Sequence, residues 1–245
     1  MRNIKIILEY DGTRYHGWQR QANMITIQQV LEESIGTITQ EAIRVIGSGR
    51  TDAGVHAVNQ VANFKTGSKI EVKNLLKGIN SLLPYDIVIK EVVDVNAAFH
   101  ARYDTRSKVY FYQIYNRPVR SALYRHYAWY IREPLDMEMM REAAALLKGT
   151  FDFSSFCASK CGIKNHVRKV MNIDIEMNGR CMINIYIEAD GFLKYMVRNI
   201  VGALVDVGKG KLSSLDLIGI LEAKDRKRAS ITAPACGLFL KEVRY

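Results

Sequence analysis

One acidic residue stands in a glycine-rich segment whose composition suits chemistry. The segment 47–56 reads GSGRTDAGVH and places three glycines around Asp52, between two stretches predicted to be strands. Glycine permits tight turns and close backbone approach, so Asp52 is expected at the apex of a turn. The Gly-Lys-Ser/Thr ending of a phosphate-binding P-loop is absent from the segment. Spacing alone favours an ordinary surface turn, because aspartate stabilises turns through its own backbone hydrogen bonds.

A second unusual residue is Arg198, which lies in the middle of the apolar stretch 192–207. Apolar positions run nearly all round this stretch, so it is predicted to be a buried helix. A guanidinium held there costs several kcal/mol unless a carboxylate and hydrogen bonds stabilise it. The helix therefore predicts a partner acid from elsewhere in the fold. Two alternatives stay open: Arg198 extends to solvent, or it pairs with an acid of purely structural role.

The elements that must position these residues alternate between strands and helices. Apolar periodicity and glycine or proline stops predict strands at 4–10, 42–46, 58–64, 87–93, 108–115, 167–177, 181–189 and 237–244. The same signals, with capping residues, predict helices at 27–38, 72–83, 137–148, 192–207 and 214–222. We expect an α+β fold of two α/β-sandwich-like halves, 1–100 and 101–245. Mainly antiparallel sheets are expected to pack side by side, with the catalytic cleft between the halves.

The composition is that of a folded, enzyme-sized protein with a basic balance. Of 245 residues, 48% are apolar and 24% are charged, which is close to globular averages. The 35 basic and 25 acidic residues give a net charge of +10. This charge favours a polyanionic partner, although solubilising charge explains it about equally well. The longest apolar stretches fall short of the ~20 residues of a membrane span, so we expect a cytoplasmic protein without membrane association.

Metal chemistry has little support in the sequence. The four cysteines form no close Cys-x-x-Cys pair, so reduced thiols are expected. Cys157, Cys161 and His166 offer three ligands for zinc without an evident fourth, so we expect no metal site. The five histidines are dispersed, whereas a metal-dependent nuclease needs clustered carboxylates and histidines.

The run 49–57, GRTDAGVHA, closely resembles the active-site motif of the tRNA pseudouridine synthase A family. The resemblance extends over nearly the whole chain. Its further runs are YDG at 10–12, GWQR at 17–20, FHAR at 99–102, the strand with Tyr110, DF at 152–153, SF at 155–156, the stretch 192–202, APA at 233–235 and GL at 237–238. A nine-residue motif with ordered companions is a specific signal. It changes the interpretation of Asp52, Tyr110 and Arg198 from structural to functional.

The resemblance implies an isomerase that converts uridine to pseudouridine in the anticodon stem-loop of tRNA, at positions 38, 39 and 40. The reaction detaches the base and rejoins it to ribose through carbon 5, so it needs no metal, nicotinamide or ATP. Asp52 takes the family's role of nucleophile. Three routes stay open for it: attack on the ribose anomeric carbon, addition to the pyrimidine ring, or assistance of an elimination.

The resemblance also assigns four substrate-binding residues. Arg198 matches the family's active-site arginine, and Asp52 is then expected to be its partner acid across the cleft. Arg50 matches an arginine that holds the target nucleotide out of the stack, with plain phosphate attraction as the alternative. Tyr110 is expected to stack on the target base, although a core or sheet-face tyrosine is the default on such a strand. Leu238 matches an apolar wall of the same pocket, and core packing suits it as well.

The expected partners follow from the same resemblance. The family works as a homodimer, and scattered Lys and Arg residues are expected to contact the tRNA, Lys224–Arg228 being the one dense basic cluster. His56 and Gln60 are placed where they could touch RNA without being catalytic. Two other interpretations are a non-catalytic RNA-binding protein on the same fold and a paralogue with narrowed RNA specificity. The intact set of aspartate, tyrosine and arginine argues against the first.

Overall fold

The chain forms two compact units, each of which contains strands and helices. The computed structural model describes residues 1–159, 162–179 and 181–245. The first unit contains Met1–Arg106 and Phe239–Tyr245, and the second contains Ser107–Leu238. The closing segment, which the sequence division assigns to the second half, lies in the first unit because it pairs with a strand there. The predicted α+β class, with mainly antiparallel strands, is confirmed.

The strands of the first unit follow the order β4-β1-β3-β10, with β2 paired to β3. The strands are β1 Arg2–Tyr10, β2 Ile46–Gly47, β3 His56–Thr66, β4 Ile87–Val95 and β10 Leu238–Arg244. β1 runs antiparallel to both of its neighbours, whereas β10 joins β3 in parallel. Ile4, Ile6 and Leu8 of β1 are fully buried, as the alternation of side chains along a strand predicts.

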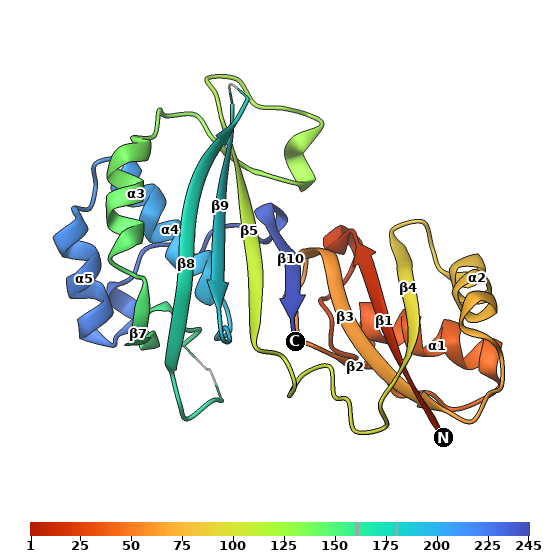
Figure 1. Cartoon of the computed structure of the whole chain (residues 1–245). Coiled ribbons are helices and arrows are strands. Elements are labelled where there is room, and N and C mark those ends of the chain that lie inside the picture. The colour runs from red at the N-terminus through yellow and green to blue at the C-terminus, as the bar shows by residue number, and fades with distance from the viewer. Residues whose placement is uncertain (160–161, 180) are drawn as a thin grey trace. The chain divides into compact units, whose positions relative to one another are not determined.

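Two helices pack in the first unit. Helix α1 spans Ile27–Thr39, and helix α2 spans Val72–Leu82. Thr26 caps α1 because its side chain accepts the backbone N–H of Gln29 at 3.4 Å. Proline at position 84 stops α2, as predicted. Figure 1 shows α2 beside β4 and α1.

The strand predicted at 42–46 is wrong in its extent, since β2 contains only Ile46 and Gly47. Side chains of α1 hold the backbone of Val45 in place of a neighbouring strand. The N–H of Val45 donates to Oε1 of Glu32 at 3.1 Å, and its C=O accepts from Nε2 of Gln28 at 3.0 Å. Periodicity does not predict this arrangement, because the partners are side chains of a helix.

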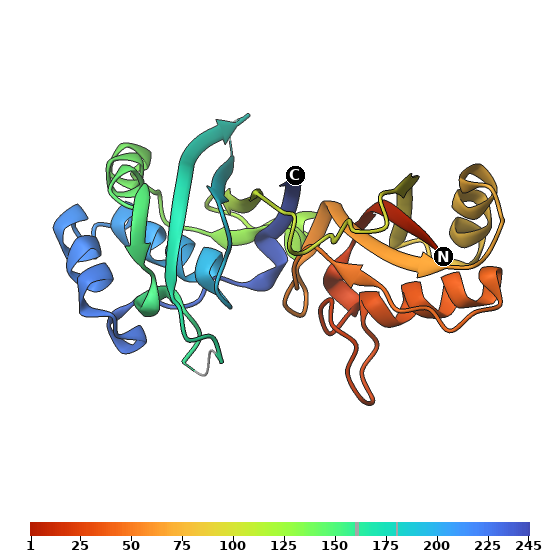
Figure 2. The ribbon, with the colours of Figure 1, turned by 60° about the horizontal axis from the view of Figure 1, so that its bottom comes forward.

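The strands of the second unit follow the order β5-β9-β8-β7, with β6 paired in parallel to β5. Its strands are β5 Ser107–Asn116, β6 Trp129–Ile131, β7 Gly149–Asp152, β8 Val167–Asn178 and β9 Met182–Ala189. Its helices are α3 Met137–Ala145, α4 Met196–Gly208 and α5 Ser214–Ala223. Figures 1 and 2 show the three helices together on one side of β8 and β9. No helix in the described part of the chain has the length and apolar character to span a membrane.

Helix α4 is shorter than predicted and packs closely on a later segment. It starts at Met196 and not at Phe192, because Tyr195 has a φ of +66° in the left-handed region, which a helix cannot continue. Within α4, a Cβ added to Gly202 would lie 1.9 Å from the carbonyl oxygen of Ile231. Glycine at this position therefore allows the segment around Ile231 to lie directly against the helix.

We predict that Gly202→Ala destabilises the second unit by at least about 2 kcal/mol, because neither the helix backbone nor the Ile231 backbone can yield to the new methyl group. Gly219→Ala is the matched control. Gly219 is also in a helix, yet a Cβ there meets nothing within 4 Å. In that variant the free energy of unfolding should rise by about 0.5–1 kcal/mol, because alanine has a higher helix propensity than glycine. Urea unfolding measures both changes, and equal values for the two variants would contradict the close approach.

Candidate active site

Asp52 lies in the loop 48–55 between β2 and β3, and its side chain is half-buried. Its carbonyl oxygen accepts the N–H of Val55 at 3.1 Å, which closes a tight turn over Ala53 and Gly54. Gly54 has a φ of +75°, a conformation that glycine adopts without strain. The predicted turn is present. Asp52 is its first residue and not its apex.

Two backbone hydrogen bonds join this loop to the N-terminal segment of the same unit. The N–H of Trp18 donates to the carbonyl oxygen of Thr51 at 3.0 Å. The N–H of Gly54 donates to the carbonyl oxygen of Tyr15 at 3.3 Å. The backbone is therefore held on both sides of Asp52, which limits the positions its carboxylate can reach.

Two glycines in the N-terminal segment make this contact sterically feasible. A Cβ on Gly12 would lie 2.0 Å from the carbonyl oxygen of Val55. A Cβ on Gly17 would lie 2.6 Å from the carbonyl oxygen of Thr51, and Gly17 also has a φ of +84°. The runs 10–12 and 17–20 thus serve to support the Asp52 loop.

A buried polar network holds the loop from the side of β1 and β3. The hydroxyl of Tyr10 lies 2.8 Å from Oγ1 of Thr51. Gln60 accepts from the hydroxyl of Ser48 at 2.7 Å and donates to the carbonyl oxygen of Gly49 at 3.1 Å. Ser48 and Gln60 are 1% and 0% exposed. Gln60 therefore has a supporting role, and the expectation that it touches RNA does not fit its burial.

His56, the first residue of β3, is buried as well. Its ring stacks on Phe239 at 4.6 Å between centroids. Its Nδ1 lies 3.0 Å from the N–H nitrogen of Gly12 and 3.1 Å from Oδ1 of Asp11. The same nitrogen cannot accept from the first and donate to the second, so the protonation state decides which hydrogen bond forms. With the imidazole covered, the predicted contact with RNA does not fit His56 either.

Arg50 lies in the loop with Asp52, two residues before it, and its side chain is exposed. Among the residues that the structure describes, no hydrogen-bond or ion-pair partner engages its guanidinium. A free planar cation beside a held carboxylate can pair with a phosphate or stack on a base.

Arg198 occupies the first turn of α4 in the second unit and is half-buried. Its Nε donates to the carbonyl oxygen of Ala233 at 2.7 Å, and the N–H of Ala233 donates to the carbonyl oxygen of Arg198 at 3.1 Å. The guanidinium carbon lies 4.9 Å from the centroid of the Tyr195 ring, within the range of a cation–π contact. These contacts fix the direction of the side chain.

Tyr110 and Leu238 are both buried in the second unit, at 6% and 5% exposure. The ring of Tyr110 meets Phe192 edge to face, with 5.0 Å between centroids. Tyr112, two residues later on the same face of β5, donates its hydroxyl to the carbonyl oxygen of Pro234 at 2.7 Å. The segment that links Arg198 to Leu238 is thereby packed against β5.

The predicted site residues fall into two groups. Asp52 and Arg50 come together in the first unit, and Tyr110, Arg198 and Leu238 belong to the second. Within the described ranges, no cluster of three or more His, Cys, Asp or Glu residues could hold a metal ion. One of the three ligands considered from the sequence, Cys161, lies outside the described residues.

Four supporting residues were not predicted from the sequence. Gly12 and Gly17 belong to runs that match the family. The conformational freedom of glycine was the signal that could have indicated a close approach of another backbone there. Tyr10 belongs to the same run as Gly12, but its place among the alternating residues of β1 did not indicate that its hydroxyl contacts the loop. Tyr195 shows no sequence signal for its left-handed backbone.

Comparisons with known proteins agree with the motif. A sequence model described as tRNA pseudouridine synthase matches residues 6–104 and 143–245. Proteins named tRNA pseudouridine synthase A from Thermoanaerobacter sp. (strain X514) and Caldicellulosiruptor bescii are 49% and 48% identical, each over 100% of both chains. The crystal structure of the archaeal box H/ACA sRNP Nop10-Cbf5 complex contains a chain with a TM-score of 0.38 and 14% identity. That match covers 93% of this chain and 59% of the other.

The Tyr10 hydroxyl that supports the loop gives a pH-dependent prediction. Burial raises the pKa of Tyr10 to about 12. Because the unfolded chain titrates near ~10, the stability that Tyr10 contributes is complete below that pH and is lost as the pH rises toward about 12. Tyr10→Phe should lower the unfolding free energy by about 1 kcal/mol at neutral pH and flatten this alkaline loss.

Urea unfolding at a series of pH values measures both effects. Tyr103→Phe is the control, since Tyr103 is 76% exposed. The same alkaline profile in wild type and Tyr10→Phe would contradict the role given to the buried hydroxyl.

Proposed function

Since the chain belongs to the tRNA pseudouridine synthase family, we propose that it is an isomerase that converts uridine to pseudouridine in tRNA. The family match covers most of the chain, and the curated relatives align over its full length. The net charge of +10 suits a polyanionic substrate.

The observation that carries this proposal is the way the Asp52 loop is held. A nucleophilic carboxylate must be presented in a constant position, yet remain accessible to substrate. Hydrogen bonds from Trp18 and Gly54 fix the backbone on either side, while the Asp52 side chain is only half-buried. We assign Asp52 the role of nucleophile.

The remaining site residues have roles suited to their side chains. Arg50 is an exposed cation in the same loop, placed to hold the target nucleotide after it leaves the stack. Arg198 binds substrate with a guanidinium oriented by Ala233 and Tyr195. Tyr110 and Leu238 supply an aromatic and an apolar wall for the base.

The finer parts of the proposal rest on the family resemblance. We propose that the target is the anticodon stem-loop, at positions 38, 39 and 40, and that the enzyme works in the cytoplasm as a homodimer. No metal or small-molecule cofactor enters the proposed reaction, because the product is an isomer of the substrate. A non-catalytic RNA-binding protein on this fold is the alternative, and it would bind tRNA without changing it.

We predict that Asp52→Asn abolishes pseudouridine formation and leaves tRNA affinity within a few-fold of wild type, because the amide keeps the shape and loses the nucleophile. Asp136→Asn is the matched control. Asp136 caps α3 by accepting the N–H of Met139, a role that asparagine fills equally well. Counting pseudouridine in tRNA after single-turnover incubation tests both variants. Turnover by Asp52→Asn comparable to wild type would refute the assignment.

We predict that Arg198→Met folds but loses roughly 100-fold in kcat/KM, about 2.7 kcal/mol of transition-state stabilisation. Methionine keeps the length and the apolar packing and removes the charge. Arg198→Lys should recover only part of the activity, because an ammonium does not reproduce the planar fork. Circular dichroism confirms folding before the kinetic comparison.

The control for this test is Arg141→Met. Arg141 lies on α3 and also donates Nε to a backbone carbonyl, that of Ile175, at 3.0 Å. Its loss should change stability slightly and activity less than two-fold. Equal kinetic effects of the two substitutions would show that Arg198 acts only through the fold.

A further inference from the structure

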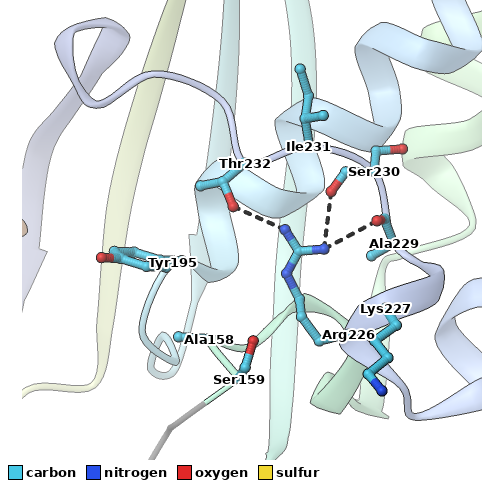
Figure 3. A pocket seen from close by; sticks show the side chains of 9 residues that line it. All are labelled: Ala158, Ser159, Tyr195, Arg226, Lys227, Ala229, Ser230, Ile231 and Thr232. Carbon is cyan, nitrogen blue, oxygen red and sulfur yellow. Dashed lines mark hydrogen bonds between the residues drawn. The ribbon is translucent and has the colours of Figure 1, made fainter.

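A pocket of about 450 Å³ in the second unit is lined by Tyr195, the residue whose ring Arg198 contacts, and has no part in the function proposed so far. This volume falls within the ~300–1,000 Å³ range of ligand sites. Three segments supply its polar lining (Figure 3). Ser159 comes from the first, Tyr195 from the start of α4, and Arg226, Lys227 and Thr232 from the third.

Arg226 lies within this lining, and Figure 3 shows its guanidinium hydrogen-bonded to Ala229, Ser230 and Thr232. Its Nη1 donates to the carbonyl oxygens of Ala229 and Ser230 at 3.1 and 3.0 Å. Its Nη2 donates to Oδ1 of Asn199 and Oγ1 of Thr232 at 3.1 and 2.9 Å. A guanidinium has five N–H donors, so these bonds leave one, on Nε, which has no partner among the described residues.

The positive charge at this pocket is not neutralised by the acids nearby. All the partners of Arg226 are neutral oxygens, and burial lowers the pKa of its guanidinium, the direction expected without a carboxylate contact. Lys227 is exposed, and its ammonium has no ion-pair partner in the described ranges. Asp225 instead accepts the backbone N–H of Lys227, and Asp152 pairs with Lys224 at 3.6 Å.

The start of helix α4 adds to this field. Tyr195 occupies the N-cap position and makes no side-chain capping hydrogen bond. Because Tyr195 lines the pocket, the partial positive charge at the N-terminal end of the helix borders it. The ammonium of Lys194 lies 5.3 Å from the centroid of the Tyr195 ring, and the guanidinium of Arg198 lies 4.9 Å from it. Several cations thus gather around one aromatic wall.

We propose that this pocket binds a phosphate group of the tRNA strand, next to the nucleotide that Arg198 contacts. The Nε–H of Arg226 and the ammonium of Lys227 supply charge-assisted hydrogen bonds to the phosphate oxygens. Arg198 and the pocket share Tyr195 as a wall, and Thr232, which is bound to Arg226, precedes Ala233, which is bound to Arg198. This inference rests on the proposed function only in taking tRNA as the ligand.

The test uses a tRNA anticodon stem-loop RNA in which one phosphate at a time is replaced by an uncharged methylphosphonate. In wild type, one such replacement should weaken binding about tenfold. Lys227→Ala should weaken binding of unmodified RNA to a similar degree and reduce the slope of log affinity against log salt by about 0.7–0.9. The same methylphosphonate should then cause no further loss in Lys227→Ala, since the contact is already absent.

Lys73→Ala is the matched control. Lys73 is an equally exposed lysine that lines a different pocket, in the first unit, beside Glu71. It should change RNA affinity less than two-fold. The proposal would be overturned if Lys73→Ala and Lys227→Ala lowered RNA affinity equally. It would also be overturned if, at every position, the methylphosphonate lowered the affinity of Lys227→Ala as much as that of wild type.

A further experiment distinguishes the binding of a tRNA phosphate from the binding of a free anion. Inorganic phosphate at millimolar concentration should stabilise wild type and Lys227→Ala equally in thermal unfolding. Selective stabilisation of wild type, without coupling to any methylphosphonate, would show a site for a small anion and overturn the assignment to tRNA. Absence of pseudouridine formation by wild type would refute the proposed function separately, because the binding cycle does not depend on turnover.

Discussion

The close approach of two backbones is the constraint on which the first unit depends. The loop that carries Asp52 lies against the N-terminal segment at distances that leave no room for a Cβ at Gly12 or Gly17. Only at such a separation can Trp18 and Tyr15 form their hydrogen bonds with the loop. The backbone that carries Asp52 is therefore positioned by residues that carry no reactive group. The buried side chains beneath the loop follow from the same constraint, since they satisfy the polar atoms that close packing removes from water.

In the second unit, arginine side chains form hydrogen bonds with the backbone of an irregular segment. The segment 229–233 has little regular structure, and its carbonyl groups need donors. Arg226 donates hydrogen bonds to the carbonyl oxygens of Ala229 and Ser230, and Arg198 donates one to the carbonyl oxygen of Ala233. Each arginine orders the backbone and still presents a positive charge. The residues that build this surface thus also supply the positive charge on which the proposed contact with RNA rests.

Much of the fold could be predicted from the sequence, because periodicity, caps and stops act locally. The strands β1, β5, β8 and β9 and the capped helix α1 illustrate this. The failures occur where distant side chains decide the backbone. Val45 is not in a strand because Gln28 and Glu32 bind it.

The candidate site shows the same division. The Asp52 motif was recognisable because the whole run 49–57 resembles that of a known family, whereas its spacing alone favours an ordinary surface turn. The buried side of the loop was not recognisable, since glutamine at position 60 and tyrosine at position 10 are ordinary residues in strands. The left-handed backbone of Tyr195 is imposed by its surroundings and not by its type.

The return of the chain to the first unit has a consequence for how the protein is made. Phe239 and Leu240 supply the parallel partner of His56 and Ala57, at the start of the strand that follows the Asp52 loop. The second unit is continuous in sequence, so all its residues leave the ribosome before that partner does. Until then, this end of β3 is an unpaired edge that invites wrong pairing. The nascent chain thus completes the pairing of the strand that follows the Asp52 loop only after the intervening unit has been synthesised, and an interrupted translation product lacks that pairing.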